Sequence, residues 1–223
     1  MKTVIKKIAL KIPLIYRARN FFKEFPRRDL FHKQLTIKNM GGGVFSKYIK
    51  GKGNYMEIGS SCFLDDCKIR IVGNNNTIIF KSGVRVGKMC SFWMEGNNIT
   101  IIIGDNTTFT HTVHFCAQED NTSIIVGNDC MFANTIIVRT SDSHPIIDIE
   151  SKQRINPAKN VTIGNHVWIA PHTKIMKGAK IGDNTIIGSN TMVSKEIPSN
   201  CLAVGAPAKI VKTGVTWTRD RLF

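Results

Sequence analysis

Aliphatic residues recur at every sixth position in the second half of this 223-residue chain. The six positions are Ile163, Ile169, Ile175, Ile181, Ile187 and Val193. A short strand that ends at such a position points its aliphatic side chain inward, and the small residues that mostly follow let the backbone turn. Three such sides close one coil, and the coils must stack because a single coil cannot bury its inward face. The repeat therefore predicts an all-β fold, a parallel β-helix.

The same register continues upstream with less regularity. Its units begin at the aliphatic–glycine pairs Ile58-Gly59, Val86-Gly87, Ile103-Gly104 and Val126-Gly127. In steps of six these pairs lead to Leu64, Phe92, Phe109, Phe115, Phe132 and Val138. Residues 140–160 leave the register and contain Asp142, His144 and two prolines, so we expect a loop that is ejected from the β-helix there.

The first quarter of the chain is strongly basic. Residues 1–53 hold 14 of the 31 Lys and Arg residues but only two of the 16 acids. Residues 1–34 have a helical pattern of apolar and basic residues that Pro13 and Pro26 interrupt, so we expect two short amphipathic helices. The glycines at 41–43 indicate a flexible junction. The sequence thus predicts a basic N-terminal segment over residues 1–53 and a β-helix domain over residues 54–223.

Two interpretations of the basic segment remain open. A basic amphipathic helix binds an anionic membrane surface, so residues 1–34 would make a peripheral membrane contact. In the other interpretation the helices pack over the open end or the flank of the β-helix. Nucleic acid is not an expected partner, because a known binding motif and aromatic residues that stack on bases are absent.

Several features favour the cytoplasm, with any membrane contact peripheral and at the inner face. No run of about 18 apolar residues is present, which argues against a transmembrane helix. The N-terminus lacks the apolar stretch and cleavage site of a signal peptide. The six cysteines form no CxxC pair, which is typical of buried thiols rather than of a disulfide framework or a zinc site.

Four stretches resemble the hexapeptide-repeat acetyltransferases, a family that includes the galactoside and maltose acetyltransferases. These stretches are residues 161–170, 180–188, 194–200 and 205–209. The run Arg139-Thr-Ser-Asp-Ser-His144-Pro, followed by Arg154-Ile-Asn-Pro and Trp168, is similar to the branch that O-acetylates bacterial capsules and lipopolysaccharides, including the polysialic acid O-acetyltransferases. The resemblance implies a left-handed parallel β-helix, a homotrimer with active sites between subunits, and acetyl-CoA as the acetyl donor.

The resemblance also implies roles for individual residues. His144 would be the general base that removes the proton of a sugar hydroxyl during direct attack on the thioester. Trp168, which follows His144 by 24 residues, would belong to the active site. Asp142 would orient the imidazole of His144 and fix its tautomer.

Further residues are assigned to the donor and the acceptor. By family position, the coenzyme A site would contain Ala170, Ser189, Ser194, Lys195, Lys209 and Lys212. His111 and His114, three residues apart in a strand-like run, would line the acceptor groove. Where the family often has Gly-Ala-Asn, this chain has Ala170-Pro171-His172, and a proline offers no backbone N–H to an oxyanion.

Other functions are weighed against this one. The chain could acetylate the nitrogen of an amino sugar nucleotide or an antibiotic. It could also be a non-catalytic solenoid or resemble the gamma-class carbonic anhydrases, which share this fold and bind zinc through three histidines. The histidine spacings of three (His111 to His114) and six (His166 to His172) do not resemble that arrangement, so we expect no metal.

Overall fold

A computed structural model describes residues 34–221, and every regular element within this range is a β-strand. The eight-stranded sheet A contains, in spatial order, β1 (Leu35–Asn39), β3 (Asn54–Ile58), β5 (Thr77–Phe80), β8 (Thr100–Ile103), β10 (Ser123–Val126), β12 (Val161–Ile163), β15 (Lys180–Ile181) and β18 (Glu196–Ile197). The helices expected before Gln34 lie outside the described residues.

The twelve-stranded sheet B forms the rest of the wall. Its main path is β2 (Gly42–Lys50), β4 (Phe63–Val72), β6 (Arg85–Val86), β9 (Thr108–Gln118), β11 (Met131–Arg139), β13 (Trp168–Ile169), β16 (Ile186–Ile187), β19 (Cys201–Val204) and β20 (Lys209–Thr213). Beside this path lie β7 (Ser91–Glu95), β14 (Lys174–Ile175) and β17 (Met192–Val193). The strands pair in parallel, except that β20 runs antiparallel to β19.

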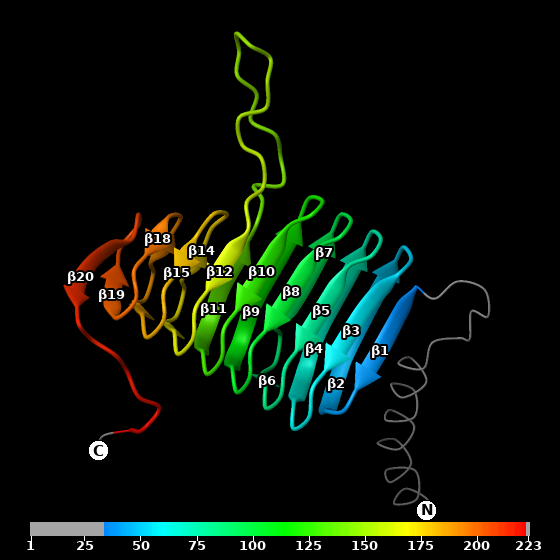
Figure 1. The fold of residues 1–223 in the computed structure, drawn as a ribbon, viewed down its shortest axis with the longest axis horizontal. Helices are drawn as coiled ribbons and strands as arrows, with labels where there is room; N and C mark the ends of the chain where they lie inside the picture. Colours follow the sequence, from blue (N-terminus) through cyan, green and yellow to red (C-terminus); the bar gives the residue numbers. More distant parts are fainter. Residues whose placement is uncertain (1–33, 222–223) are drawn as a thin grey trace, which may run out of the picture. The chain divides into compact units, whose positions relative to one another are not determined.

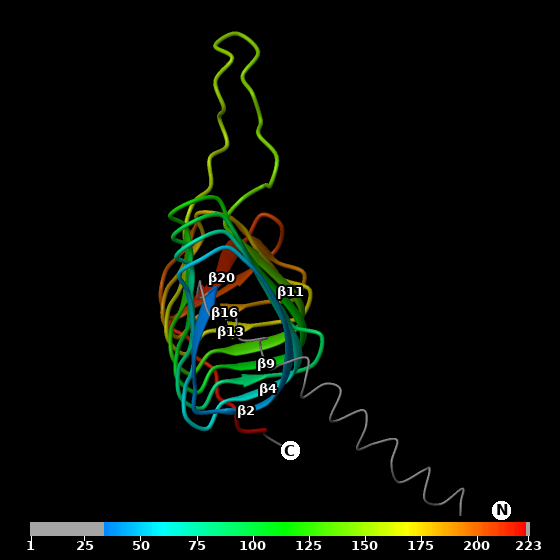
Figure 2. The ribbon, with the colours of Figure 1, turned by 90° about the vertical axis from the view of Figure 1, so that its right-hand side faces the viewer.

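The strands stack into the coils of a parallel β-helix (Figures 1 and 2). Near the N-terminal end, the hydrogen bonds between equivalent corners join residues 22 or 23 apart, as from Asn76 to Asn54. Near the C-terminal end the step from Asn165 to Asp183 is 18 residues, which is three units of six. The long strands of the wider coils turn a corner at single residues of positive φ, namely Asp66, Thr112 and Thr135.

The six-residue repeat occupies the predicted inward positions. Ile163 pairs with Ile181, Ile169 with Ile187, and Ile175 with Val193, so each pair lies on one of the three sides of successive coils. All six side chains are buried. Burial of each contributes about 1.5–3 kcal/mol, which is why this stretch is the most regular part of the fold.

Phenylalanines fill the wider N-terminal coils. Phe80, Phe92, Phe109, Phe115 and Phe132 are all buried and form a continuous stack. The ring centroids of Phe80 and Phe92 are 4.9 Å apart, and those of Phe109 and Phe132 are 4.7 Å apart. A wider coil encloses more space than aliphatic side chains fill, and aromatic rings supply the missing volume.

The β-helix begins earlier than the sequence predicted. Strands β1 and β2 pair with β3 and β4, so the first coil starts at Leu35 instead of residue 54. The expected flexible junction at the glycines is a hydrogen-bonded corner of this coil, where the Gly42 amide donates to the Cys62 carbonyl oxygen. Gly43 has a φ of 107°, and a Cβ there would overlap the carbonyl oxygen of Leu64. Close stacking of coils, not flexibility, therefore explains these glycines.

The predicted ejected loop is confirmed. Strand β11 ends at Arg139 and β12 begins at Val161, and the segment between them projects away from the coils (Figures 1 and 2). The corner-to-corner step that includes it is 37 residues. The loop is a hairpin, in which the Ile155 amide donates to the Ile146 carbonyl oxygen and Ile147 bridges Arg154.

The cysteines are free thiols, and five of the six are buried. Burial raises the pKa of Cys67 to about 12 and that of Cys130 to about 11, which keeps these thiols protonated and unreactive. No described residue belongs to a helix that is long and apolar enough to cross a membrane.

Candidate active site

An ion pair ties the two stems of the loop to the wall. Arg154, on the returning stem, donates through both terminal nitrogens to the two carboxylate oxygens of Glu119, each at 2.7 Å. The hydroxyl of Ser141, on the outgoing stem, donates to the same carboxylate at 2.6 Å. The guanidinium of Arg154 lowers the pKa of Glu119 to about 2. Two-point binding of this kind fixes direction as well as distance, so the base of the loop is held in one orientation.

Asn156 holds the backbone around His144. Its side-chain amide is buried between the stems and donates to Oδ2 of Asp142 and to the His144 carbonyl oxygen, both at 2.9 Å. Its side-chain oxygen accepts from the Ile146 amide at 2.6 Å. The His144 side chain is exposed, and these bonds engage its main chain only. The fold therefore presents an imidazole at the root of the loop without using the ring itself.

Asp142 is engaged by a lysine rather than by His144. Its Oδ2 lies 2.6 Å from Nζ of Lys177, which also donates to the Asn156 carbonyl oxygen. Hydrogen bonds from Lys177 and Asn156 lower the pKa of Asp142 below its usual value. Among the described residues, the expected bond from Asp142 to the imidazole of His144 is not formed, and Asn156 links Asp142 to the His144 carbonyl oxygen instead.

The C-terminal residues cover His166, for which no catalytic or binding role was predicted. The imidazole of His166 stacks on Trp217, with ring centroids 4.4 Å apart, and its Nδ1 lies 2.7 Å from Asp129 Oδ2. Arg219 donates to the other oxygen of Asp129 at 2.8 Å. Burial acts to raise the pKa of Asp129, but the bonds from His166 and Arg219 hold it below its usual value. Trp168 lies beside this cluster, with its ring centroid 6.2 Å from that of Trp217.

Trp168 and His144 lie next to opposite ends of β11 within one chain. Trp168 pairs with Met131 at the start of β11, whereas His144 follows the end of that strand. The strand turns a corner at Thr135 between them. The two residues that the sequence placed together in one site thus lie on different sides of successive coils.

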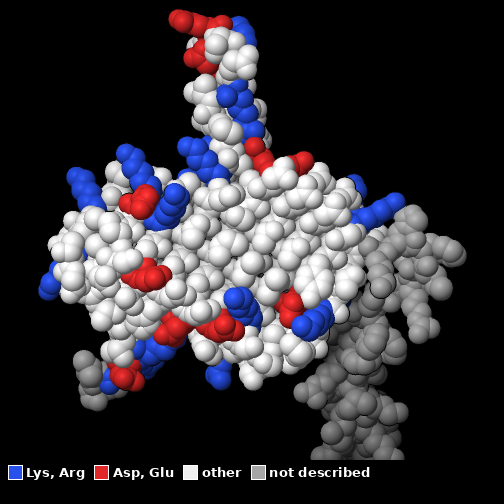
Figure 3. All heavy atoms as spheres, in the orientation of Figure 1, with Lys and Arg blue, Asp and Glu red and all other residues white. Residues whose placement is uncertain are grey.

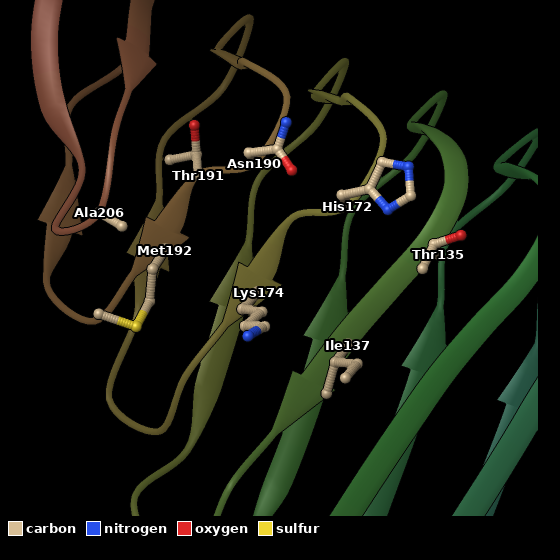
Figure 4. A pocket seen from close by; sticks show the side chains of 8 residues that line it. All are labelled: Thr135, Ile137, His172, Lys174, Asn190, Thr191, Met192 and Ala206. Atoms are coloured by element: carbon tan, nitrogen blue, oxygen red, sulfur yellow. The ribbon is translucent and has the colours of Figure 1, made fainter.

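A groove on sheet B contains polar side chains from successive coils. It is called the His172 groove here, and Figure 4 shows His172 and Asn190 on consecutive corners above Lys174. Its lining residues are Thr135, Ile137, His172, Lys174, Asn190, Thr191, Met192 and Ala206. His114 pairs with Ile137, a lining residue, and its Nδ1 lies 2.7 Å from the Ser91 hydroxyl oxygen. His111 pairs with Asn134, one residue before lining residue Thr135. The two histidines expected at the acceptor thus lie along the margin of this groove.

A second groove brings together three of the expected coenzyme A residues. Ser194, Lys195 and Lys209 line it with residues of β17, β18 and β20, and we call it the Lys195 groove. Pro207 lines this groove and its neighbour Ala206 lines the His172 groove, so the two grooves are adjacent. Ser189 and Lys212 are exposed but line neither groove. Ala170 is buried and also lines neither.

The backbone around Pro171 has no free donor. The amide of Ala170 donates to the Ile187 carbonyl oxygen and the amide of His172 donates to the Asn134 carbonyl oxygen. An oxyanion contact at this position must therefore come from elsewhere. Between residues 34 and 221, no three His, Cys, Asp or Glu side chains gather into a group that could hold a metal.

Comparisons with known proteins agree with the fold that the six-residue repeat predicts. Residues 160–195 match the bacterial transferase hexapeptide (six repeats) family. The polysialic acid O-acetyltransferase of Escherichia coli O1:K1 / APEC is 55% identical over 84 residues, which are 38% of this chain and 27% of that protein. The polysialic acid O-acetyltransferase of Neisseria meningitidis is 37% identical over 119 residues, which are 53% of each chain. The matched regions thus span 27% and 53% of the length of these relatives.

A solved structure extends the likeness to most of the chain. The polySia specific acetyltransferase NeuO is 32% identical, with a TM-score of 0.58, and the comparison covers 84% of this chain and 90% of that one. Its coils match those described above, which agrees with the predicted left-handed parallel β-helix. At this identity and coverage common descent is established, and the chain belongs to the hexapeptide-repeat acetyltransferase family, in the branch of the capsule and polysialic acid O-acetyltransferases.

Proposed function

We propose that the protein is an acetyl-CoA-dependent O-acetyltransferase. Its acceptor is a sugar hydroxyl of a bacterial capsular polysaccharide, a lipopolysaccharide or their precursor. The observation that carries the proposal is His144, whose main chain is held by Asn156 at the root of a loop that interrupts a regular β-helix. The two relatives named polysialic acid O-acetyltransferases support a polysaccharide acceptor.

The exposed ring of His144 fits the role of general base. A hydroxyl oxygen attacks a thioester well only if its proton leaves as the new bond forms, and imidazole is the side chain most often used for this. Acetyl-CoA supplies the acetyl group, and direct attack needs no covalent enzyme intermediate when both substrates are bound together. His144 takes the hydroxyl proton and then returns it to the departing thiolate sulfur. Within the described part of the chain its hydrogen bonds are made by the main chain, which leaves both ring nitrogens available for this transfer.

The adjacent grooves suit the two ends of coenzyme A. Lys195 and Lys209 line one groove and Lys174 lines the other. Their ammonium groups would bind phosphates as point charges, and the apolar Ile137 and Met192 would contact the pantetheine arm. Ser189, Ser194 and Lys212 lie on the same C-terminal coils and complete the proposed donor site.

The proposed active site forms between protomers of a homotrimer. Because Trp168 and His144 lie on different sides of successive coils in one chain, the proposed site takes His144 from one protomer and Trp168 from the next. The Asp129–His166–Trp217 cluster would then brace Trp168 against the acceptor or the acyl group. Closed threefold symmetry repeats this arrangement three times.

An acceptor panel tests the proposed function. Release of free coenzyme A from acetyl-CoA is measured with a capsular polysaccharide, an amino sugar nucleotide and an amine-bearing antibiotic, and the products are identified by mass spectrometry. Turnover of the hydroxyl acceptor, and its loss in His144→Gln, is the expected result. Turnover of amines alone would contradict O-acetylation, and turnover that survives in His144→Gln would contradict the general base.

A further inference from the structure

An outward row of side chains runs along sheet B from the first coil to the loop. Tyr48 pairs with Arg70, Arg70 with Trp93, Trp93 with Cys116, and Cys116 with Arg139. We call these five residues the arginine–aromatic row. Neighbouring strands are about 4.8 Å apart, so the row spans roughly 19 Å along the axis of the β-helix.

Aromatic rings flank one arginine in this row. The guanidinium carbon of Arg70 lies 4.6 Å from the ring centroid of Tyr48 and 5.8 Å from that of Trp93. Among the described residues, no carboxylate forms an ion pair with Arg70 or Arg139. Stacking on rings holds a guanidinium in place and leaves its N–H edge free for an oxygen ligand.

Two buried donors in the row lack partners. Nε1 of Trp93 and Nε of Arg139 are both shielded from solvent, and neither has a hydrogen bond within the described residues. They flank Cys116, so they lie on either side of one position. Buried N–H groups rarely stay unsatisfied, and a ligand with acceptor oxygens would satisfy both after the two side chains rotate to expose them.

The row ends at the proposed base. A terminal nitrogen of Arg139 donates to the Ser143 hydroxyl oxygen at 2.9 Å, and Ser143 precedes His144. Ser143 in turn donates to the side-chain oxygen of Gln118. A ligand that lies along the row would therefore present one of its units at the root of the loop.

The charge around the row is mainly positive. Lys68 and Lys50 are exposed on the same side of β4 and β2, two residues from Arg70 and Tyr48 respectively. The acid on this side is Glu95, whose carboxylate accepts from the Gln118 amide at 3.3 Å. In the view of Figure 3, by contrast, the central part of the solenoid carries few charged side chains.

We propose that the arginine–aromatic row binds an acidic oligosaccharide, with sugar rings stacked on Tyr48 and Trp93 and carboxylates paired with Arg70 and Arg139. This inference rests on the proposed function, because it assigns the acceptor subsite that leads to His144. It also explains why consecutive coils keep these side chains in register, since a linear polymer repeats its carboxylate along its length. A neutral acceptor would leave both guanidinium groups unpaired.

A binding experiment tests the row independently of catalysis. Sialic acid oligomers of defined length are titrated into the protein without acetyl-CoA, and carboxyl-reduced oligomers of equal length serve as the uncharged probe. Arg70→Gln removes one charge-assisted contact and is expected to weaken binding of the long acidic oligomer about tenfold. Arg85→Gln, on β6 of the next coil and outside the row, is the matched control and should bind as the wild type does.

The kinetic arm separates this inference from the proposed function. Arg70→Gln should raise KM for the long oligomer by a larger factor than it changes kcat, whereas Arg85→Gln should leave KM and kcat as in the wild type. Equal binding of acidic and carboxyl-reduced oligomers, an equal loss in Arg85→Gln, or a change of oligomeric state in Arg70→Gln without weaker binding would each overturn the proposal. If no acceptor is acetylated, the proposed function is wrong. The binding titration still shows in that case whether the arginine–aromatic row binds an acidic oligosaccharide.

Discussion

Asn156 shows how one buried amide organises the site at the residue scale. Only 7% of its surface is exposed, and its polar atoms bond the outgoing stem at Asp142, His144 and Ile146. Its carbonyl oxygen accepts from Lys177 on the wall. A buried network that is fully bonded is rigid, so the main chain at His144 is fixed while its ring is free to meet a substrate.

The first prediction concerns the imidazole. His144→Gln keeps the length and polarity of the side chain but removes its basicity, so kcat for sugar O-acetylation should fall by about 10²–10⁴-fold. Because the ring makes no hydrogen bond with any residue between 34 and 221, the thermal midpoint should stay within about 1 °C of the wild type. A coupled assay of free coenzyme A and a melting curve are the two measurements. A variant that melts normally and keeps full kcat would exclude His144 as the base.

The second prediction concerns the side-chain amide of Asn156, which bonds the main chain at His144. Asn156→Ala removes the bonds to Asp142, to the His144 carbonyl oxygen and to the Ile146 amide, so both kcat and the order of the loop should decrease. Asn160→Ala, at the end of the same loop, removes a bond to Ser123 of the wall and is the matched control. Rates above those of His144→Gln but below those of Asn160→Ala are expected. Equal rates for the two asparagine variants would argue against the positioning role.

At the scale of elements, the loop is a hairpin whose stem, rather than its tip, meets the wall. Figure 3 shows acidic side chains near its tip and basic ones along its stem. Arg154 on that stem pairs with Glu119, at the corner that follows β9. This ion pair and the Asp142–Lys177 pair therefore both hold the stem at the candidate site.

The third prediction follows from the lowered pKa of Glu119. A carboxyl group whose pKa falls from 4.5 to about 2 on folding stabilises the closed stem above pH 4.5 and loses this contribution as the pH falls towards 2. The protection factors of the Ile146 and Ile155 amides, which are corrected for the intrinsic pH dependence of exchange, should therefore decrease below about pH 4. Glu119→Gln should lose this pH dependence and exchange about tenfold faster at pH 7. Glu196→Gln, an exposed acid on β18, should behave as the wild type does.

The sequence predicted the elements whose signal is local and periodic. Ile163 to Val193 lie inward as expected because each six-residue unit carries its own aliphatic residue and corner. The first coil was missed because Leu35–Lys50 has strand alternation but no regular corner signal, and its glycines were assigned to flexibility. The Glu119–Arg154 pair and the His166–Trp217 stack join residues 35 and 51 apart. No short-range pattern specifies contacts at such separations, so the sequence could not show them.

At the scale of the whole molecule, the two ends of the chain are expected to have different roles. The C-terminal end supports the candidate active site, and the N-terminal end is expected to contact a membrane. The C-terminal tail braces Trp168 through Trp217, and the basic N-terminal segment lies mostly outside the described residues. The fourth prediction is that deletion of residues 1–33 releases the protein from vesicles with anionic lipids and leaves turnover of a short acceptor unchanged. Vesicle sedimentation measures the first effect. If the full chain never binds such vesicles, the membrane contact is excluded and the packing of this segment on the β-helix is favoured.

The central claim is an acetyltransferase site that forms between protomers, and subunit complementation tests it most directly. His144→Gln and Trp168→Ala are each expected to be nearly inactive alone. After the two variants are unfolded, mixed in equal amounts and refolded, random trimers pair an intact His144 with an intact Trp168 at about one quarter of all interfaces. Sugar O-acetylation should therefore recover to about a quarter of the wild-type rate. A mixed preparation that forms trimers but stays as inactive as its parents would contradict the account.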